Sequence, residues 1–194
     1  DKLMKINFVN GDLIWIKNRT QASTYSLQDS TIGFGDDKTL RPDTSNAQDT
    51  NGNLYGYVNN TFNGGFNLNG GSDHGSSRVN SSSSGAKHIA WCWKAGGNSN
   101  TFNVDGAGYA SASAAGITDG SISLTNASVN REAGFSIVRY TGTGSSGTVG
   151  HGLGATPNIV ITKSRSATGS WAVLDTVGNS TAEYGLFLND NGGY

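Results

Sequence analysis

The sequence predicts an all-β protein, and its composition and its patterning both point to this class. It contains 29 glycines among 194 residues, only two prolines, and charged residues at 14%, well below the roughly 25% of an average soluble protein. Glu, Lys and Arg, which usually fill the solvent-facing positions of helices, are therefore scarce. Short β-branched or aromatic runs recur between Gly, Asn and Asp residues, which is typical of strands joined by turns.

Nine segments have the composition of strands bounded by turn residues. They are 13–18, 25–29, 53–58, 88–94, 121–124, 134–141, 158–163, 170–175 and 184–189. In HIAWCWK (88–94), the bulky residues Ile89, Trp91 and Trp93 alternate with small ones, which gives the strand a large-residue face and a small-residue face. This pattern suits the centre of a β-sandwich, so Trp91, Cys92 and Trp93 are expected in the core.

An internal repeat relates the two ends of the chain. At an offset of 146, the difference between Lys163 and Lys17, residues 13–33 align with 159–179 without a gap. Like residues fall together in this alignment: Lys17 with Lys163, Arg19 with Arg165, Tyr25 with Trp171, Asp29 with Asp175 and Leu40 with Leu186. A constant offset over this length predicts two copies of one module. The alternative is that strand–loop–strand patterns are alike by default.

The repeat also predicts a domain organisation. Residues 1–96 correspond to the later part of one β-sandwich module, and 117–194 to the opening part of a second. The Gly-, Ser- and Ala-rich stretch 97–116 between them is interpreted as a linker. We therefore expect a fragment of a longer, tandemly repeated protein. The alternative is one self-contained sandwich whose two ends are similar by chance.

Several motifs, taken together, resemble a known family. They are DLIWIKNR (12–19), TSNAQDTNG (44–52), HIAWCWKAGG (88–97), GFSIV (134–138), YTG (140–142), VGHGLG (149–154) and the Lys-x-Arg element at 163–165. In this order and spacing they resemble the repeated module of tail-fibre and other virion proteins of tailed bacteriophages. The resemblance implies an antiparallel β-sandwich of jelly-roll, concanavalin A-like type on the surface of a virion.

The resemblance implies a structural or adhesive function and supplies no catalytic residues, so no enzyme activity is expected. The expected partners are further copies of the chain, as a trimer if it forms a fibre, other virion proteins and host-surface glycan. Two alternatives stay open, a capsid-decorating (cement) protein and a glycan-degrading enzyme of lectin-like fold. The enzyme needs two carboxylates about 5 to 10 Å apart, and the only glutamates, Glu132 and Glu183, stand in unrelated contexts.

The segment DTNGNLYGYVNN (49–60) is the candidate glycan site. Asp49 and Asn51 offer polar groups to sugar hydroxyls, and Tyr55 and Tyr57, two apart on one predicted strand face, offer rings for stacking. The alternative is that these tyrosines cap the core or an interchain contact. The segment also spaces oxygen ligands as a calcium loop does, but it lacks the glycine and the closing glutamate of an EF-hand. No metal or other cofactor is therefore expected, and Ca²⁺ binding by this segment is the less favoured alternative.

The charges that the two copies share predict an architectural role. The lysine and arginine of each copy project to one face and are expected to form salt bridges with the aspartate of that copy. These residues are Lys17, Arg19 and Asp29 in the first copy and Lys163, Arg165 and Asp175 in the second.

The glycine-rich VGHGLG (149–154) is interpreted as a turn between strands. An oxyanion loop would accompany a Gly-x-Ser-x-Gly elbow, and a phosphate loop would open a helix, whereas β-branched NIVIT (158–162) follows here. The net charge of −1, without a cluster of Lys and Arg, argues against a nucleic-acid partner. No apolar run approaches the ~20 residues that cross a bilayer, so membrane insertion is not expected.

Overall fold

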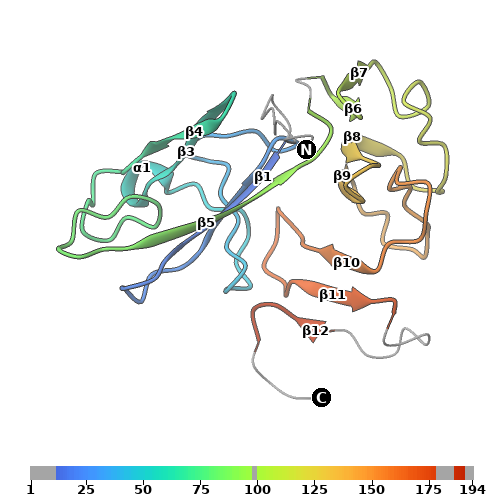
Figure 1. The fold of residues 1–194 in the computed structure, drawn as a ribbon. Coiled ribbons are helices and arrows are strands. Elements are labelled where there is room, and N and C mark those ends of the chain that lie inside the picture. Colours follow the sequence, from blue (N-terminus) through green and yellow to red (C-terminus); the bar gives the residue numbers. More distant parts are fainter. Residues whose placement is uncertain (1–11, 98–99, 178–185, 191–194) are drawn as a thin grey trace.

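The computed structural model describes residues 12–97, 100–177 and 186–190, which are almost entirely strands and turns (Figure 1). The elements are β1 (Asp12–Asn18), β2 (Ser26–Asp29), α1 (Gly52–Tyr55), β3 (Tyr57–Phe62), β4 (Gly65–Asn69), β5 (His88–Lys94), β6 (Phe102–Val104), β7 (Ala107–Tyr109), β8 (Leu124–Asn130), β9 (Phe135–Tyr140), β10 (Ile159–Thr162), β11 (Ala172–Asp175) and β12 (Leu186–Phe187). The prediction of an all-β protein is confirmed.

The described strands form four sheets. The sheets β2-β1-β5 and β10-β11-β12 are antiparallel, β3 and β4 form a hairpin, and β7-β6-β8-β9 combines antiparallel pairs with one parallel pair, β6 with β8. Figure 1 places β6–β9 to the right of β1 and β5, with β10–β12 below. The architecture is therefore several small, mostly antiparallel sheets packed together.

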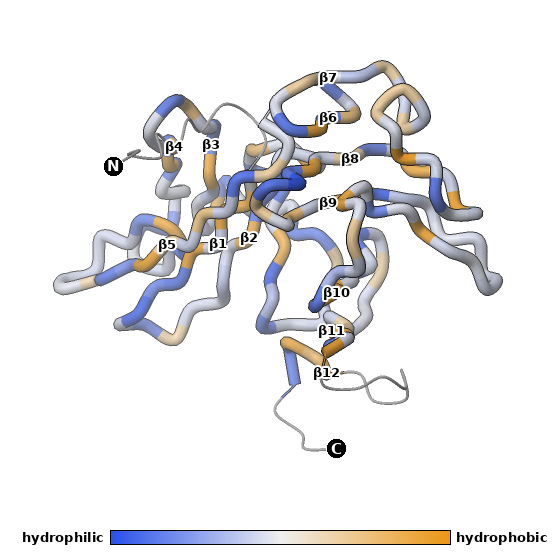
Figure 2. Tube along the Cα trace, turned by 45° about the vertical axis from the view of Figure 1, so that its right-hand side comes forward, coloured by the Kyte–Doolittle hydropathy of each residue, from blue (hydrophilic) through white to orange (hydrophobic). Residues whose placement is uncertain are grey.

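Alternation along the strands creates the packed faces. On β1, Ile14 and Ile16 are buried on one side, whereas Leu13 and Trp15 point to the other. Figure 2 shows that apolar and polar residues follow each other in short stretches along the chain. Strands with one buried face and one exposed face need this kind of change in hydropathy. The buried clusters are Ile14, Ile16, Val58 and Val79; Leu27, Leu40 and Trp171; and Phe102, Val104, Ala115, Ile117, Ala127 and Val129.

The described residues of 97–116, which are 97 and 100–116, belong to the fold, so the prediction of a linker is wrong. This stretch contains β6 and β7, and its side chains of Phe102, Val104 and Ala115 are at most 8% exposed. Its few apolar residues are separated by Gly, Ser and Asn, a composition that is also typical of linkers. Sequence composition alone does not distinguish a linker from a segment whose small residues allow close packing.

The strand β5 lies at the edge of its sheet, not at the centre of a sandwich. It pairs with β1 along its whole length, and the sheet order places it outermost among the described strands. Ile89, Trp91 and Trp93 are 37%, 41% and 38% exposed, and Cys92 is exposed as well. The prediction that these residues are core is therefore wrong, because alternation separates two faces of a strand without determining what covers either face.

The predicted strand 53–58 is divided between two elements. Residues 52–55 form the short helix α1, and Gly56, at a φ of +83°, turns the chain into β3. A left-handed φ of this kind is open to glycine at little cost. Tyr55 and Tyr57 therefore lie on different elements, and their expected position on one strand face is wrong.

The hairpins β1–β2 and β10–β11 have the same register at the offset of 146. Leu13 lies opposite Asp29 in the first hairpin. Ile159 lies opposite Asp175 in the second, and the next three pairs of each hairpin correspond in the same way.

Contacts beyond the hairpins also recur at this offset. They are the pairing of Leu27 with Leu40, matched by Val173 with Leu186, and the bond from Tyr25 N–H to Asp43 Oδ1 (3.2 Å), matched by Trp171 N–H to Asn189 Oδ1 (2.7 Å). The two segments that the sequence aligns therefore share one backbone arrangement.

Candidate functional site

Five aromatic rings form a continuous row that runs from the residue before β2 across β1, β5 and β9. They are Tyr25, Trp15, Trp91, Trp93 and Phe135. Trp15 lies opposite Trp91 in the β1–β5 pair, which places both rings on one face of the sheet. The centroid of the Trp15 ring is 5.8 Å from that of Tyr25, 6.0 Å from that of Trp91 and 6.5 Å from that of Trp93.

The row continues from β5 to the next sheet through Trp93. Its ring stacks on Phe135 of β9 at a centroid distance of 6.3 Å and an interplanar angle of 20°. Tryptophan rings are among the largest apolar groups in proteins and usually lie in cores or at interfaces. Two partly exposed tryptophans at the centre of such a row form a surface that can stack on a flat apolar partner, such as one face of a sugar ring.

The polar surroundings of the row come mainly from β1 and the turn after it. Lys17 lies on the same side of β1, with its Nζ 4.7 Å from the centre of the Tyr25 ring. That ammonium also donates a hydrogen bond to the carbonyl oxygen of Ser23. The aromatic row therefore ends at a fixed positive charge.

The other face of β5 carries a small apolar hollow. Its volume is about 100 Å³, below the roughly 300 Å³ at which ligand pockets usually begin. It is lined by Ile14, Thr61, Gly64, Gly65, Phe66 and Cys92. The aromatic row, which is a surface, is thus the stronger candidate for ligand contact.

The structure does not bring the four predicted glycan residues together as one surface. Asp49 is 3% exposed, and its carboxylate forms ion pairs with Arg78 and, at 3.7 Å, with Arg41. Its Oδ1 accepts the N–H of Asn51 at 2.9 Å, while the side chain of Asn51 is exposed. Asp49 is thus engaged inside the protein.

The two tyrosines are engaged in different contacts. The guanidinium of Arg78 lies 4.5 Å from the centre of the Tyr55 ring. The hydroxyl of Tyr57 accepts a hydrogen bond from Asn69 Nδ2 at 3.1 Å. Both rings are partly buried. Arg78, the partner of Asp49 and Tyr55, was not singled out from the sequence.

Burial and ion pairing act in opposite directions on Asp49. Burial favours the neutral carboxyl, but the Asn51 N–H and the charges of Arg78 and Arg41 outweigh it and hold the pKa of Asp49 below its usual value. The aspartate is therefore ionised at neutral pH. Asp49, Arg78 and Arg41 form a buried ionic cluster with a structural role.

Both repeat aspartates accept hydrogen bonds from backbone N–H groups. Asp29 Oδ1 accepts the N–H groups of Thr31 (2.7 Å) and Ile32 (3.1 Å). At the offset of 146, Asp175 Oδ1 accepts the N–H of Val177 at 2.9 Å. Burial raises the pKa of Asp29, although these hydrogen bonds act in the opposite direction. The shared aspartate therefore shapes the turn after the second strand of each hairpin.

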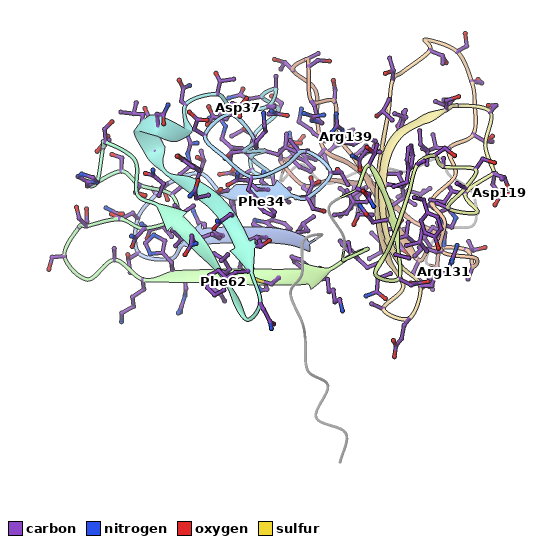
Figure 3. All side chains as sticks on the ribbon, turned by 90° about the horizontal axis from the view of Figure 1, so that it is seen from above. Phe34, Asp37, Phe62, Asp119, Arg131 and Arg139 are labelled. Atoms are coloured by element: carbon purple, nitrogen blue, oxygen red, sulfur yellow. The ribbon has the colours of Figure 1, made fainter. Side chains whose placement is uncertain are left out.

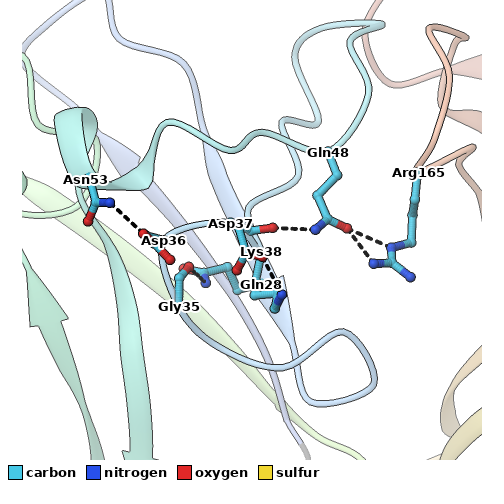
Figure 4. A network of polar contacts seen from close by, with 8 residues as sticks. All are labelled: Gln28, Gly35, Asp36, Asp37, Lys38, Gln48, Asn53 and Arg165. Atoms are coloured by element: carbon cyan, nitrogen blue, oxygen red, sulfur yellow. Dashed lines mark hydrogen bonds and ion pairs between the residues drawn. The ribbon is translucent and has the colours of Figure 1, made fainter.

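The repeat cations of the second hairpin hold its loop against the first half of the chain (Figure 4). Arg165 donates two hydrogen bonds to Gln48 Oε1, at 2.8 and 2.6 Å. Gln48 in turn donates to the carbonyl oxygen of Asp37. Lys163 reaches the carbonyl oxygen of Ser45 at 3.3 Å, whereas Arg19 of the first copy is exposed.

Other bonds fix the same arrangement of sheets. The Trp171 indole donates to the carbonyl oxygen of Arg41 at 3.0 Å. Arg139 reaches from β9 to the carbonyl oxygen of Thr31, in the region between the two groups of strands in Figure 3. Both bonds join segments far apart in the sequence, which no local pattern could reveal.

The segment 149–154 is a turn, as the sequence predicts. Gly152 and Gly154 both have a φ of +75°, and His151 Nδ1 accepts the N–H of Leu153 at 3.2 Å. His151 thus closes the turn locally. Glu132 lies exposed in the turn between β8 and β9, and Glu183 lies outside the described residues.

The described ranges contain no group of three or more His, Cys, Asp or Glu residues that could hold a metal ion. In the same part of the chain, no helix has the length and apolarity to cross a membrane.

The fold is an all-β domain that exposes the tryptophans Trp91 and Trp93 on an edge strand. The chain belongs to the family described as domain of unknown function DUF7483, whose model matches residues 2–194. That match runs across both equivalent hairpins. No curated protein matches the chain. No solved structure matches it either.

Proposed function

We propose that this domain is a structural and adhesive module of a bacteriophage tail fibre or virion surface protein. It acts by non-covalent contact with other virion chains, including copies of itself, and with host glycan. Its small sheets are arranged as a β-sandwich of jelly-roll, concanavalin A-like type. The motif resemblance motivates the phage setting.

The exposed aromatic row carries the adhesive part of the proposal. Trp91 and Trp93 are 41% and 38% exposed although they are bulky apolar residues. Such residues are normally buried or at interfaces. Their rings are fixed by Trp15 and Phe135, so a ligand that stacks on them orders little of the protein on binding.

A glycan array tests adhesion with the isolated domain and the variants Trp91→Ala and Trp93→Ala. We expect wild type to bind a subset of glycans and each variant to bind them at least about fivefold more weakly, as expected for the loss of a central aromatic contact. Phe62→Ala is the matched control, because Phe62 is also an exposed aromatic residue, 49% exposed, on the separate β3–β4 hairpin (Figure 3).

The outcomes separate adhesion from assembly. Equal loss in the Phe62 control, or binding that survives both tryptophan substitutions, would contradict a glycan site on the row. If the folded wild-type domain bound none of the glycans on the array, the adhesive role would be rejected. Immuno-electron microscopy of intact particles then tests the structural role, which requires the domain to be found on the virion.

A further inference from the structure

The strands β10 and β1 occupy equivalent positions in hairpins of the same register, but they differ in their neighbouring strands. β1 is the central strand of its sheet, with β2 on one edge and β5 on the other. β10 has β11 on one edge and is the outermost strand of its sheet in the described part of the chain. Among the described residues, no strand pairs with the edge of β10 that corresponds to the β5-binding edge of β1, and this edge is called the open edge below.

The backbone of β10 offers hydrogen bonds at this open edge. Thr176 N–H donates to the carbonyl oxygen of Asn158 at 2.9 Å, so the backbone of Asn158 faces the β11 side. Because successive residues of an antiparallel strand direct their backbone groups to opposite neighbours, Val160 also faces β11. The N–H and C=O groups of Ile159 and Ile161 point to the open edge.

The same alternation operates in β1. Leu27 and Leu40 exchange two backbone hydrogen bonds, of 2.9 and 2.8 Å, so Leu27 does not bond Trp15, which lies opposite it. The backbone of Trp15 therefore faces β5 and its partner Trp91. Ile161 stands at the position that corresponds to Trp15, and it has the same backbone orientation.

The side chains at this edge are apolar and uncovered. Ile159 is 60% exposed and Ile161 is 48% exposed. The four residues of β10 include no charge and no proline, the features that usually keep an edge strand from pairing with another chain. An apolar, unprotected edge of this kind favours the addition of a strand.

We propose that the open edge of β10 binds an extended segment of the same chemistry as β5, supplied by another polypeptide. That chemistry is a run with tryptophans at alternate positions and small residues between them. The β1–β5 pair, in which Leu13, Ile14 and Trp15 lie opposite Trp93, Cys92 and Trp91, supplies the register. The bound segment runs antiparallel to β10 and covers its two exposed isoleucines.

Transferred to β10, this register places the position of Cys92 opposite Val160. Because the backbone of Val160 faces β11, Val160 and the opposing residue of the docked segment form a pair without mutual hydrogen bonds. In such pairs the Cα atoms of opposing residues are closest, at about 4.5 Å. Directly opposed cysteines at such a pair are close enough for a disulfide. The register therefore predicts a specific cross-link. It involves no sugar, so its failure leaves the glycan proposal untouched.

The test uses a synthetic peptide of residues 87–96, KHIAWCWKAG, with its cysteine activated as a mixed disulfide. The protein carries Cys92→Ser with either Val160→Cys or Thr162→Cys. The protein thiolate attacks the peptide sulfur and releases the activating thiol, so bond formation and bond breakage balance. We expect the Val160→Cys protein to capture the peptide at least about tenfold faster than the Thr162→Cys protein does. The reason is that docking of the peptide strand raises the effective concentration of its cysteine beside position 160.

A shifted peptide provides the reciprocal control. In the β1–β5 pair Ile16 lies opposite Ala90, so Thr162 is expected to lie opposite position 90 of the peptide. A peptide with Ala90→Cys and Cys92→Ala should reverse the preference toward Thr162→Cys. Thr162 is the more exposed of the two sites, so simple accessibility would favour it with both peptides.

Three results would overturn the proposal. The first is equal capture at both positions, and the second is capture no faster than with a scrambled peptide. The third is attack on the peptide adduct by the introduced thiolate of a second Val160→Cys molecule, which releases the peptide thiol and leaves a homodimer. Accumulation of this homodimer in place of the adduct would assign the edge to a second copy of the chain. Circular dichroism of each variant confirms that it is folded before the assay.

Discussion

Replacing Asp49 by Asn should destabilise the protein strongly, because it removes the negative charge from a buried ionic cluster. The side chains of Asp49 and Arg78 are 2% and 6% exposed. An asparagine retains an oxygen that can accept the Asn51 N–H but cannot neutralise the guanidinium. Arg78 would then keep its contact with the Tyr55 ring but remain charged and buried without the Asp49 carboxylate.

The expected cost follows from this burial. Breaking a buried ion pair by removing one partner typically costs about 3–5 kcal/mol, since the remaining charge is left uncompensated. The free energy of unfolding of a whole domain is about 5–15 kcal/mol. The variant should therefore lose a large share of its stability, with a melting temperature lower by roughly 6–20 °C for a chain of this size.

Urea unfolding and thermal unfolding, both followed by circular dichroism, measure this effect. Asp105→Asn is the matched control, because the ion pair of Asp105 with Arg131 has side chains that are 43% and 42% exposed. Exposed pairs are worth about 0–1 kcal/mol. Asn at this position also keeps an oxygen acceptor for the Arg131 N–H, which Asp105 binds at 2.8 Å.

Two results would refute this reasoning. One is a decrease in the free energy of unfolding for Asp49→Asn that is no larger than the decrease for Asp105→Asn. The other concerns the double variant Asp49→Asn, Arg78→Met, which removes both charges and should recover part of the loss. Strictly additive losses in the double variant would mean that the unpaired arginine is not the cause.

Two further predictions concern a turn and a close backbone contact. Burial raises the pKa of Asp29, so its contribution to stability is full below the unfolded pKa of about 3.9 and falls as pH rises through the folded value. Asp29→Asn should therefore be more stable than wild type at neutral pH in urea unfolding, with the difference shrinking near pH ~4; a difference that grows on acidification would contradict the assignment. Gly150→Ala should cost about 1–3 kcal/mol in the same assay, because its Cβ would overlap the Asp119 carbonyl oxygen. Gly169→Ala, with nothing within 4 Å of its Cβ, should be neutral, and equal losses at the two glycines would refute the steric argument.

Local patterns were sufficient where the structure depends on neighbours in the sequence. The strands of both hairpins follow from β-branched and aromatic runs, and the turn at 149–154 follows from glycines that adopt positive φ. The offset of 146 also identified segments with the same strand register. These features depend on the period of two along a strand and on turn chemistry, both of which are local.

The candidate site was less accessible to such reasoning. Trp91 and Trp93 were expected in the core, yet they are partly exposed on an edge strand. The only available signal was the concentration of tryptophan in two short segments, 13–18 and 88–94, and that signal fits a core equally well. Asp49 was expected at the surface, but its burial depends on Arg78, which lies 29 residues away in the sequence.

The sequence by itself therefore determined the all-β class and the equivalence of the two segments that form β1–β2 and β10–β11. Only the tertiary structure decided which faces and edges are covered, because coverage depends on segments brought together over long distances. β1 and β10 illustrate the division: their hairpins pair alike, but β5 completes the sheet of β1, while β10 stays at the edge of its own. Two similar local sequences thus differ in exposure because, among the described residues, β1 is paired on both edges and β10 on one.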